Sequence, residues 1–316
     1  RLGLDATYYR SNIKNQILNV PLDRATGYNY SVMNSGLVQN KGIELALNGV
    51  PLKSSKGLNW DVAVTFAANR NKIVSLADSV DNYVMQTGPR GSMEARVGGR
   101  MGDLYGLGYS RSPDGQIIYN SQGYPVLTEE AFYLGRATPD FNWGVVNNFR
   151  YKQWRLKVLV DGQYGAVAYS HTHAAASVAG KLTNSLPGRY TGIIGKGVQR
   201  NPDGTFRPND VVAEEIGTYY NEHFKADNVE ANTFSTDFIK LRELRLDYTL
   251  PAKWMKKIKF QKAVIGIYGR DLFVWSDWPA YDPEFGTLGN SDIQRGFEVG
   301  QFPSTRNFGA NLSFTF

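Results

Sequence analysis

Hydrophobic and polar residues alternate without a break over the last ten residues, 307–316 (NFGANLSFTF). A period of two gives one apolar face and one polar face, which is how a β-strand lies between two different media. The apolar face consists of Phe308, Ala310, Leu312, Phe314 and Phe316. Because the strand ends on an aromatic residue, the pattern suggests lipid beside this face.

The same period of two recurs in seven further segments, which we predict to be β-strands. They cover residues 2–9, 43–48, 58–69, 141–151, 154–164, 243–250 and, less cleanly, 263–275. Charged residues recur on the second face of these segments, as they would in a polar lumen. The side chains predicted to face the membrane include Leu244, Leu246, Tyr248, Phe308, Leu312 and Phe314.

The connections between the predicted strands are of two kinds. The short ones are 50–57, 152–153 and 251–262, and the long ones are 11–36, 73–139, 166–236 and 276–305. They alternate strictly, which is expected when short turns lie on one side of a membrane and long loops on the other. This parity predicts an all-β antiparallel transmembrane barrel in the outer membrane, with extracellular long loops and a periplasmic C-terminus. A soluble β-sandwich is the alternative that the segregation of loop lengths disfavours.

Composition narrows the class of protein further. The chain has 316 residues and no Cys, which excludes disulfides, thiol nucleophiles and thiolate metal sites. Its net charge of +6 is spread along the chain, apart from a lysine cluster at 253–262, so nucleic acid is not indicated as a partner. No apolar run approaches the roughly 20 residues of a membrane helix. Tryptophan and tyrosine near both strand ends fit aromatic girdles, namely Trp143, Trp275, Trp278, Tyr151, Trp154 and Trp254.

Several motifs of the chain resemble the C-terminal half of the barrel in the SusC/RagA family of TonB-linked outer membrane transporters of Bacteroidetes. The matching segments are GLDATYYRSNIKNQIL (3–18), NSGLVQNKGIELAL (34–47), LGRATPDF (134–141), NNFRY (147–151), FIKLRELRLDYTLP (238–251), YGRDLFVWSDWPAYDPEFG (268–286) and FPSTRNFGANLSFTF (302–316). Asn142, Trp143 and Asp271 depart from the family pattern, which leaves the closeness to any one member open.

The resemblance implies a non-enzymatic importer without a cofactor. Such transporters are plugged barrels of about 22 strands. They take up a nutrient, often an oligosaccharide and sometimes a peptide, using TonB, and a SusD-like lipoprotein covers the mouth. The chain contains neither the plug nor a TonB box, so residues 1–316 are expected to be the C-terminal part of a larger barrel.

Charge placement separates such a part from a self-contained small barrel. An eight-stranded barrel has an interior filled by side chains. Closing one from these segments would bury nine charged residues, which is costly unless they are paired. They are Asp5, Asp61, Arg150, Arg155, Lys157, Asp161, Glu243, Arg245 and Asp247. A wide lumen accommodates these charges. The charge placement therefore favours the interpretation that the chain is part of a larger barrel over a self-contained adhesin or enzyme.

Candidate chemistry is confined to the long loops. His171 and His173 are two residues apart, and on an extended chain they would point the same way as a possible metal pair, although no third ligand is identifiable. Aromatic side chains could stack on sugar rings or on the partner lipoprotein. The candidates for ligand binding are Tyr190, Tyr219, Tyr220, Trp278, Tyr281 and Asp282. Pinning the loops together is an equally good role for the aromatic ones.

Overall fold

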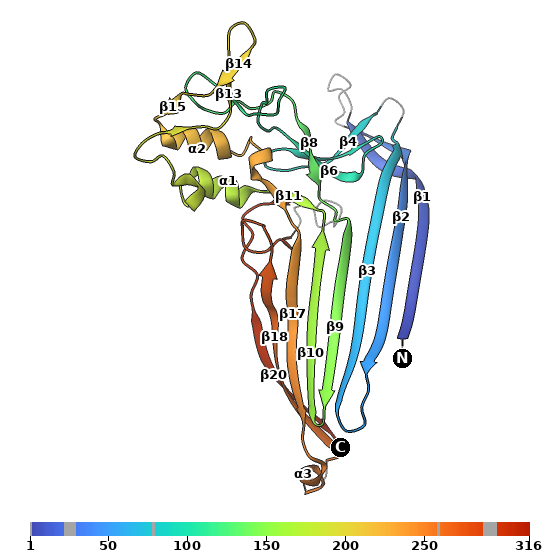
Figure 1. Cartoon of the computed structure of the whole chain (residues 1–316). Coiled ribbons are helices and arrows are strands. Elements are labelled where there is room, and N and C mark those ends of the chain that lie inside the picture. Colours follow the sequence, from blue (N-terminus) through green and yellow to red (C-terminus); the bar gives the residue numbers. More distant parts are fainter. Residues whose placement is uncertain (1, 22–29, 78–79, 258–259, 287–295) are drawn as a thin grey trace.

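The fold is a large antiparallel sheet that carries a lobe of folded loops at one end (Figure 1). A computed structural model describes residues 2–21, 30–77, 80–257, 260–286 and 296–316. The sheet contains β1 (Leu2–Pro21), β2 (Tyr30–Leu52), β3 (Leu58–Ser75), β9 (Phe141–Tyr151), β10 (Trp154–Tyr164), β17 (Phe238–Thr249), β18 (Lys262–Trp275) and β20 (Asn307–Thr315). These strands confirm the eight segments predicted from the period of two.

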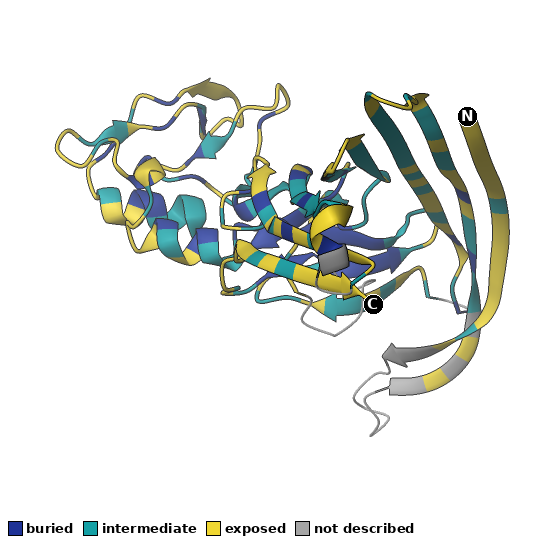
Figure 2. Ribbon diagram, turned by 90° about the horizontal axis from the view of Figure 1, so that it is seen from below, coloured by how far each residue is buried: buried dark blue, intermediate teal, exposed yellow. Residues whose placement is uncertain are grey.

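The eight strands follow one another in chain order, and each pairs with the next in antiparallel fashion. The sheet is curved, as the view along the strands shows (Figure 2). It is also open, because β1 forms one edge and β20 the other. The prediction of an all-β, barrel-type antiparallel sheet of about eight strands is therefore confirmed, and the described chain does not close a barrel by itself.

The short connections lie at one end of the sheet and the long ones at the other (Figure 1). Residues 53–57 join β2 to β3, and two residues, Lys152 and Gln153, join β9 to β10. Lys152 adopts a left-handed backbone conformation with φ 52°, which lets the chain reverse within this tight turn. Helix α3 (Ala252–Lys257) lies between β17 and β18. The C-terminus is at the same end as these short connections (Figure 1).

The first predicted loop, 11–36, is wrong in its bounds, because β1 continues to Pro21 and β2 begins at Tyr30. Ile13 pairs with Val38 and Ile17 with Asn34 in the same ladder. The face that is apolar earlier in β1 carries Asn12, Lys14 and Gln16 here, so the period of two fades while the backbone ladder continues. The remainder of this connection lies outside the described residues.

The other long connections fold into what we call the loop lobe. Its strands are β4 (Asn82–Thr87), β5 (Ser92–Arg96), β6 (Met101–Gly106), β7 (Ile118–Tyr119), β8 (Phe132–Arg136), β11 (Val167–Ser170), β12 (Ile193–Ile194), β13 (Val198–Arg200), β14 (Phe206–Pro208), β15 (Val212–Ala213), β16 (Thr233–Ser235) and β19 (Phe297–Glu298). Its helices are α1 (His171–Val178) and α2 (Ile216–Phe224), with single 3₁₀ turns at Thr183–Ser185 and Glu230–Asn232. The sequence patterns did not predict these short elements.

The hydrophobic core lies mainly in the loop lobe and at its junction with the sheet. Met93, Leu104, Tyr169 and Phe297 are all at most 1% exposed and pack in one cluster. By contrast, large apolar residues of the sheet are open to the surroundings: Leu4 is 67% exposed and Phe308 75%. Among the described residues, no helix is both long enough and apolar enough to cross a membrane.

Candidate functional site

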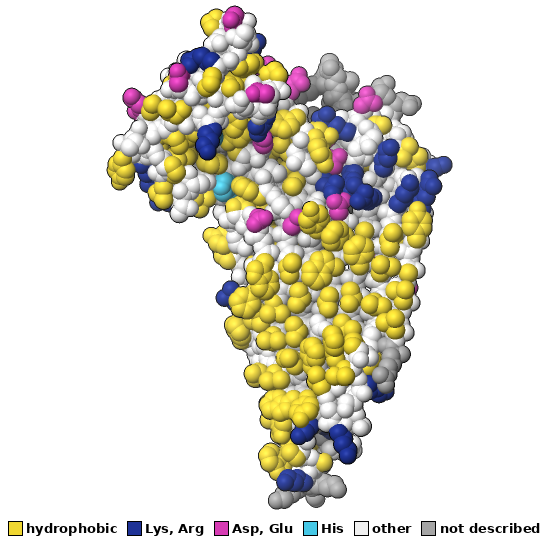
Figure 3. Space-filling view, in the orientation of Figure 1, with side chains coloured by type: hydrophobic (Ala, Val, Ile, Leu, Met, Phe, Trp, Pro, Cys, Tyr) yellow, Lys and Arg dark blue, Asp and Glu magenta, His cyan; other side chains and the backbone are white. Residues whose placement is uncertain are grey.

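One face of the sheet is a broad hydrophobic surface, which we call the apolar face (Figure 3). Cross-strand register builds it, because Leu246 pairs with Leu156 on one side and Ile267 on the other, and Ile265 pairs with Leu312. All six residues predicted to face the membrane lie on this face. They are Leu244, Leu246, Tyr248, Phe308, Leu312 and Phe314. Contact of these side chains with lipid stays a prediction.

The opposite face carries a network of ion pairs, which we call the charge ladder. Arg150 Nη2 lies 2.5 Å from Asp61 Oδ2, between β9 and β3. Glu243 accepts from Lys157 Nζ at 3.0 Å and from Arg270 Nε at 3.1 Å, so it joins β10, β17 and β18. These pairs help a single sheet face to hold many charges, since Asp61 and Glu243 each meet a cation. Lys157 and Glu243 also line a hollow of about 310 Å³.

A second cluster, the mouth cluster, lies where β17 meets the last long connection. Lys240 Nζ is 2.5 Å from Asp282 Oδ1 and 2.5 Å from Glu284 Oε2. Arg242 donates through Nε to Asp161 at 2.7 Å and also pairs with Glu284. Lys240 is only 3% exposed, so its charge depends on these two carboxylates. The cluster therefore ties segment 276–286 to the wall of the sheet.

A strand irregularity makes the mouth cluster possible. The register of β17 shifts between Leu241 and Glu243, leaving Arg242 as the extra residue of a bulge. Sequence reasoning missed Lys240 and Arg242 as functional residues. The available signal was the adjacent polar pair Arg242 and Glu243, which interrupts the alternation of leucines in FIKLRELRLDY.

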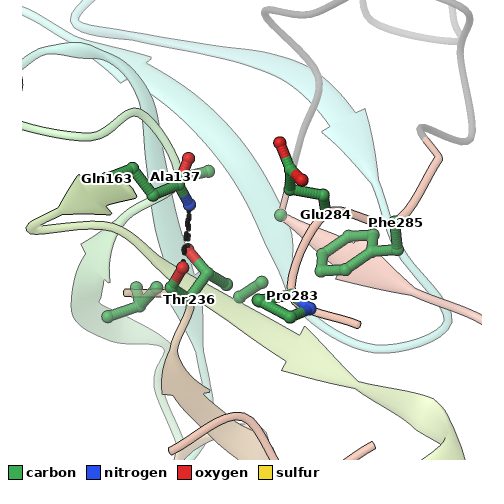
Figure 4. Close-up of a pocket in the computed structure, with 9 residues that line it drawn as sticks. Ala137, Gln163, Thr236, Pro283, Glu284 and Phe285 are labelled. Carbon is green, nitrogen blue, oxygen red and sulfur yellow. Dashed lines mark hydrogen bonds between the residues drawn. The ribbon is translucent and has the colours of Figure 1, made fainter. Parts of the chain in front are cut away.

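A small cavity of about 140 Å³ lies beside the mouth cluster (Figure 4). Gln163 and Thr236 form one wall, and Gln163 Nε2 donates to the Thr236 carbonyl at 2.8 Å. Pro283, Glu284 and Phe285 form the opposite wall. The volume is smaller than the roughly 300 to 1,000 Å³ of typical small-molecule sites. We therefore assign this cavity to packing of the last long connection against β10 and β17.

The aromatic candidates divide by burial. Tyr219 and Tyr220 are 6% and 7% exposed and form part of a core cluster, and Tyr220 Oη donates to the Pro187 carbonyl at 2.9 Å. Trp278 is also buried and stacks on Phe285, with ring centroids 5.2 Å apart. These three side chains pin loops together, and Trp278 does not belong to an exposed girdle.

Tyr190 and Tyr281 are the aromatic candidates that remain open, at 101% and 60% exposure. Tyr190 borders a groove of about 500 Å³ between α1 and the start of α2. Asp282 belongs to the mouth cluster instead of an open site. Burial would raise the pKa of this carboxyl, but the hydrogen bond from Lys240 and further donors hold it below its usual range.

The expected geometry of the histidine pair is wrong, because His171 and His173 are in the first turn of helix α1. Two helical residues at this spacing point in nearly opposite directions, unlike those of an extended chain. His173 is buried, and its Nδ1 lies 2.9 Å from Asn232 Oδ1. In the described part of the chain, no group of three or more His, Cys, Asp or Glu side chains is arranged to hold a metal ion.

The neighbouring buried Glu298 has a structural role. It accepts from Thr172 Oγ1 at 2.6 Å, from Ser170 Oγ at 2.7 Å and from the Gln301 amide at 3.0 Å. Burial would raise the pKa of Glu298, but these hydrogen bonds lower it below its usual value. The carboxylate thus secures the start of α1 against β19.

His223 makes the loop lobe sensitive to acid. Burial lowers the pKa of His223 from 6.5 to about 4, and Nδ1 lies 2.9 Å from Tyr109 Oη. In the unfolded lobe His223 would bind a proton near pH 6.5, whereas in the folded lobe His223 stays neutral down to about pH 4. The free energy of unfolding of the loop lobe is therefore at its full value above pH 6.5. As the pH falls to 4, we expect it to decrease by roughly 3 kcal/mol.

Amide-exchange protection factors of α2 at pH 7 and pH 4.5 measure this loss. In a His223→Gln variant, which keeps an acceptor for Tyr109, the fall in protection should largely disappear. An unchanged fall would show that other groups cause it.

The sheet, its two faces and the placement of its connections define a class of fold. An up-and-down antiparallel sheet with one apolar and one ion-paired face, and with its long connections at one end, has the architecture of the wall of a β-barrel.

Comparison with known proteins agrees with a β-barrel architecture. No protein-family model matches the chain. The chain is 24% identical over its whole length to TonB-dependent receptor P3 of Formosa agariphila, covering 32% of that protein. It is also 24% identical to TonB-dependent receptor P26 of the same organism, covering 33% of it. The chain thus spans about a third of the length of the curated relatives it matches.

Solved structures share the fold. The structure of the RagAB peptide transporter superposes on the entire chain with a TM-score of 0.73 at 15% identity, covering 33% of that chain. The closed-closed state of the RagAB peptide importer gives 0.72 at 17% identity, covering 34%. These similarities confirm the resemblance: the chain is similar to TonB-dependent receptors over its whole length, and it shares the fold of the corresponding third of the RagAB transporter chain.

Proposed function

We propose that residues 1–316 are the C-terminal part of the barrel of an outer-membrane active importer. The importer takes up a nutrient with energy supplied through TonB. The observation that carries this proposal is the sheet with two unlike faces and segregated connections, in a chain similar to TonB-dependent receptors. A soluble protein would have no use for an apolar face of this extent.

The two open edges of the sheet support a barrel completed by further strands on the N-terminal side. In that barrel the charge ladder faces a wide wet lumen or a polar plug, where its ion pairs remain hydrated. The loop lobe is extracellular and the C-terminus periplasmic. The same open edges count against a self-contained adhesin or enzyme, and we assign no catalytic role and no cofactor.

We propose an oligosaccharide as the principal substrate. The exposed ring of Tyr190, beside a groove in the loop lobe, can stack on a sugar. The same lobe would meet a SusD-like lipoprotein at the mouth. A peptide is the second candidate, supported by the dense paired charges along the polar face and by the fold shared with a protein described as a peptide transporter.

Uptake measurements test the function and separate the two substrates. Cells that make the full-length transporter and cells that lack it would be given labelled oligosaccharides or labelled peptides. Importer-dependent uptake that stops when the proton-motive force is dissipated supports the proposal. If cells with and without the transporter took up each label equally, the importer function would be refuted. Transporter-dependent uptake of peptide alone would establish a peptide as the substrate.

The exposed tyrosine yields a sharper prediction. Tyr190→Ala should weaken oligosaccharide binding about fivefold, because a stacked ring contributes roughly 1 kcal/mol. Tyr151→Ala is the matched control, since Tyr151 is 47% exposed at the opposite end of the sheet. Titration calorimetry on the purified transporter measures both. Equal affinities of the two variants would remove Tyr190 from the site.

A further inference from the structure

Three basic side chains stand directly opposite one another on β1, β2 and β3. In the register of the sheet, Arg10 pairs with Lys41, and Lys41 pairs with Arg70. Two residues earlier along β1, Tyr8 occupies the last apolar row, opposite Ile43. Since side chains two residues apart point to the same face of a strand, the three cations lie on the apolar face. We call them the basic row.

Further cations extend the basic row toward the long-loop end. Lys72 lies one row beyond Arg70, opposite Gln39, whose Nε2 donates to Asn12 Oδ1 at 3.1 Å. Lys14 continues the same face of β1. Arg10, Lys14, Lys41, Arg70 and Lys72 are all exposed. Basic side chains gather above the hydrophobic surface over these strands (Figure 3).

Acidic residues do not balance this patch. In the described residues 2–14, 39–47 and 58–72, the positions on the apolar face include no Asp or Glu. Among the residues that the structure describes, the one carboxylate paired with the row is Asp140, 3.9 Å from Arg70 Nη2. Asp140 also pairs with Arg136 and with Arg100, at 3.4 Å. One carboxylate therefore meets three guanidinium groups, and the local charge stays positive.

Such an arrangement is unfavourable without an anion. Directly opposite residues have Cβ atoms about 5 Å apart, and like charges there destabilise a sheet. Multivalent phosphate groups relieve this repulsion, because Arg and Lys donate several charge-assisted hydrogen bonds to phosphate oxygens. The patch begins where the apolar residues stop, which is the depth of lipid headgroups if the apolar face lies in a membrane.

We propose that the basic row, with Lys14 and Lys72, binds the phosphates of a phosphorylated glycolipid in the membrane leaflet on the loop side. The acyl chains of that lipid would lie on the apolar rows beneath, where Leu4 and Tyr8 are 67% and 66% exposed. The assignment rests on the membrane orientation in the proposed function. A headgroup site is favoured over one for free phosphate because the cations and the apolar surface are continuous.

The test uses the full-length transporter, folded in detergent micelles, with diphosphoryl lipid A as the probe. Native mass spectrometry reports the bound lipid and its affinity. Dephosphorylated lipid A should bind far more weakly. Replacing the basic row, in an Arg10→Gln, Lys41→Gln, Arg70→Gln triple variant, should weaken lipid A binding about a hundredfold, at roughly fivefold per cation.

The matched control replaces exposed lysines in the short connection between β2 and β3, as Lys53→Gln with Lys56→Gln. It should bind lipid A as the parent does. If the triple variant does not fold, Lys41→Gln alone should still weaken binding about fivefold.

Two results would overturn the site. They are equal binding of the two lipid A forms, or equal affinities of the triple variant and the parent. Full displacement of lipid A by millimolar inorganic phosphate would reassign the patch to free phosphate. A parent protein that folds without detergent or lipid would refute the proposed function itself, and this outcome is distinct from the others.

Discussion

Replacing Leu246 by arginine is expected to block assembly of the sheet into a membrane. Leu246 lies on the apolar face of β17, between Leu156 and Ile267. An arginine facing lipid near the bilayer midplane of a β-barrel costs roughly 2 to 4 kcal/mol. The loss should appear as a reduced fraction of heat-modifiable folded protein in the outer membrane, and as a lower midpoint in urea after refolding into vesicles.

An arginine introduced on the polar face of the sheet provides the control. Ala67 is an exposed residue on the polar face of β3, opposite Glu44 and Asn142. Ala67→Arg should assemble close to normally, because an arginine there meets water or a carboxylate. Normal assembly of Leu246→Arg, or equal defects in the two variants, would contradict the proposed orientation of the faces.

Replacing Lys240 by methionine is expected to release the last long connection from the barrel wall. The change removes the cation that pairs with Asp282 and Glu284 and leaves the Asp282 carboxylate, 13% exposed, without its main partner. Breaking one side of a buried ion pair costs about 3 to 5 kcal/mol. We expect this cost to appear mainly as local opening, because β17 retains its backbone ladders to β10 and β18.

Hydrogen exchange measures the opening. In Lys240→Met, amides in 280–286 should exchange faster while those of β10 keep their protection. Adding Asp282→Asn should restore part of the protection, since it removes the uncompensated charge. Lys262→Met, at an exposed position of β18, is the control and should change nothing. Unaltered exchange in 280–286 would show that Lys240 does not hold this connection.

The sequence predicted the sheet well, for a reason visible in β20 and β3. A strand with an apolar side and a polar side must alternate along its whole length, so the residues of 308–316 and 60–68 show in their sequence which face each side chain takes. Loop lengths then predicted the direction of each strand. The pattern failed beyond residue 10, where polar side chains replace apolar ones on the apolar face of β1 while the backbone ladder to β2 continues to Pro21.

The loop lobe could not be predicted in the same way. The sequence predicted Tyr219 and Tyr220 as candidates for ligand binding. In the structure they are buried in a cluster with Tyr119, about a hundred residues earlier in the chain. Helix α1 begins at His171 because Ser170 Oγ accepts from the His173 amide and Glu298 accepts from Thr172. The second contact joins residues that are 126 positions apart, and no local pattern contains it.

The sequence by itself thus determined the eight strands, their two faces and the end of the sheet at which each connection lies, because these depend on period and length alone. Only the tertiary structure decided which charges become paired and which tyrosines stay open. The Arg242 bulge and the contact of Lys240 with Asp282 depend on how a distant connection returns to the wall. The same holds for the basic row, because cross-strand register, which sequence alternation leaves free, brings Arg10, Lys41 and Arg70 into line.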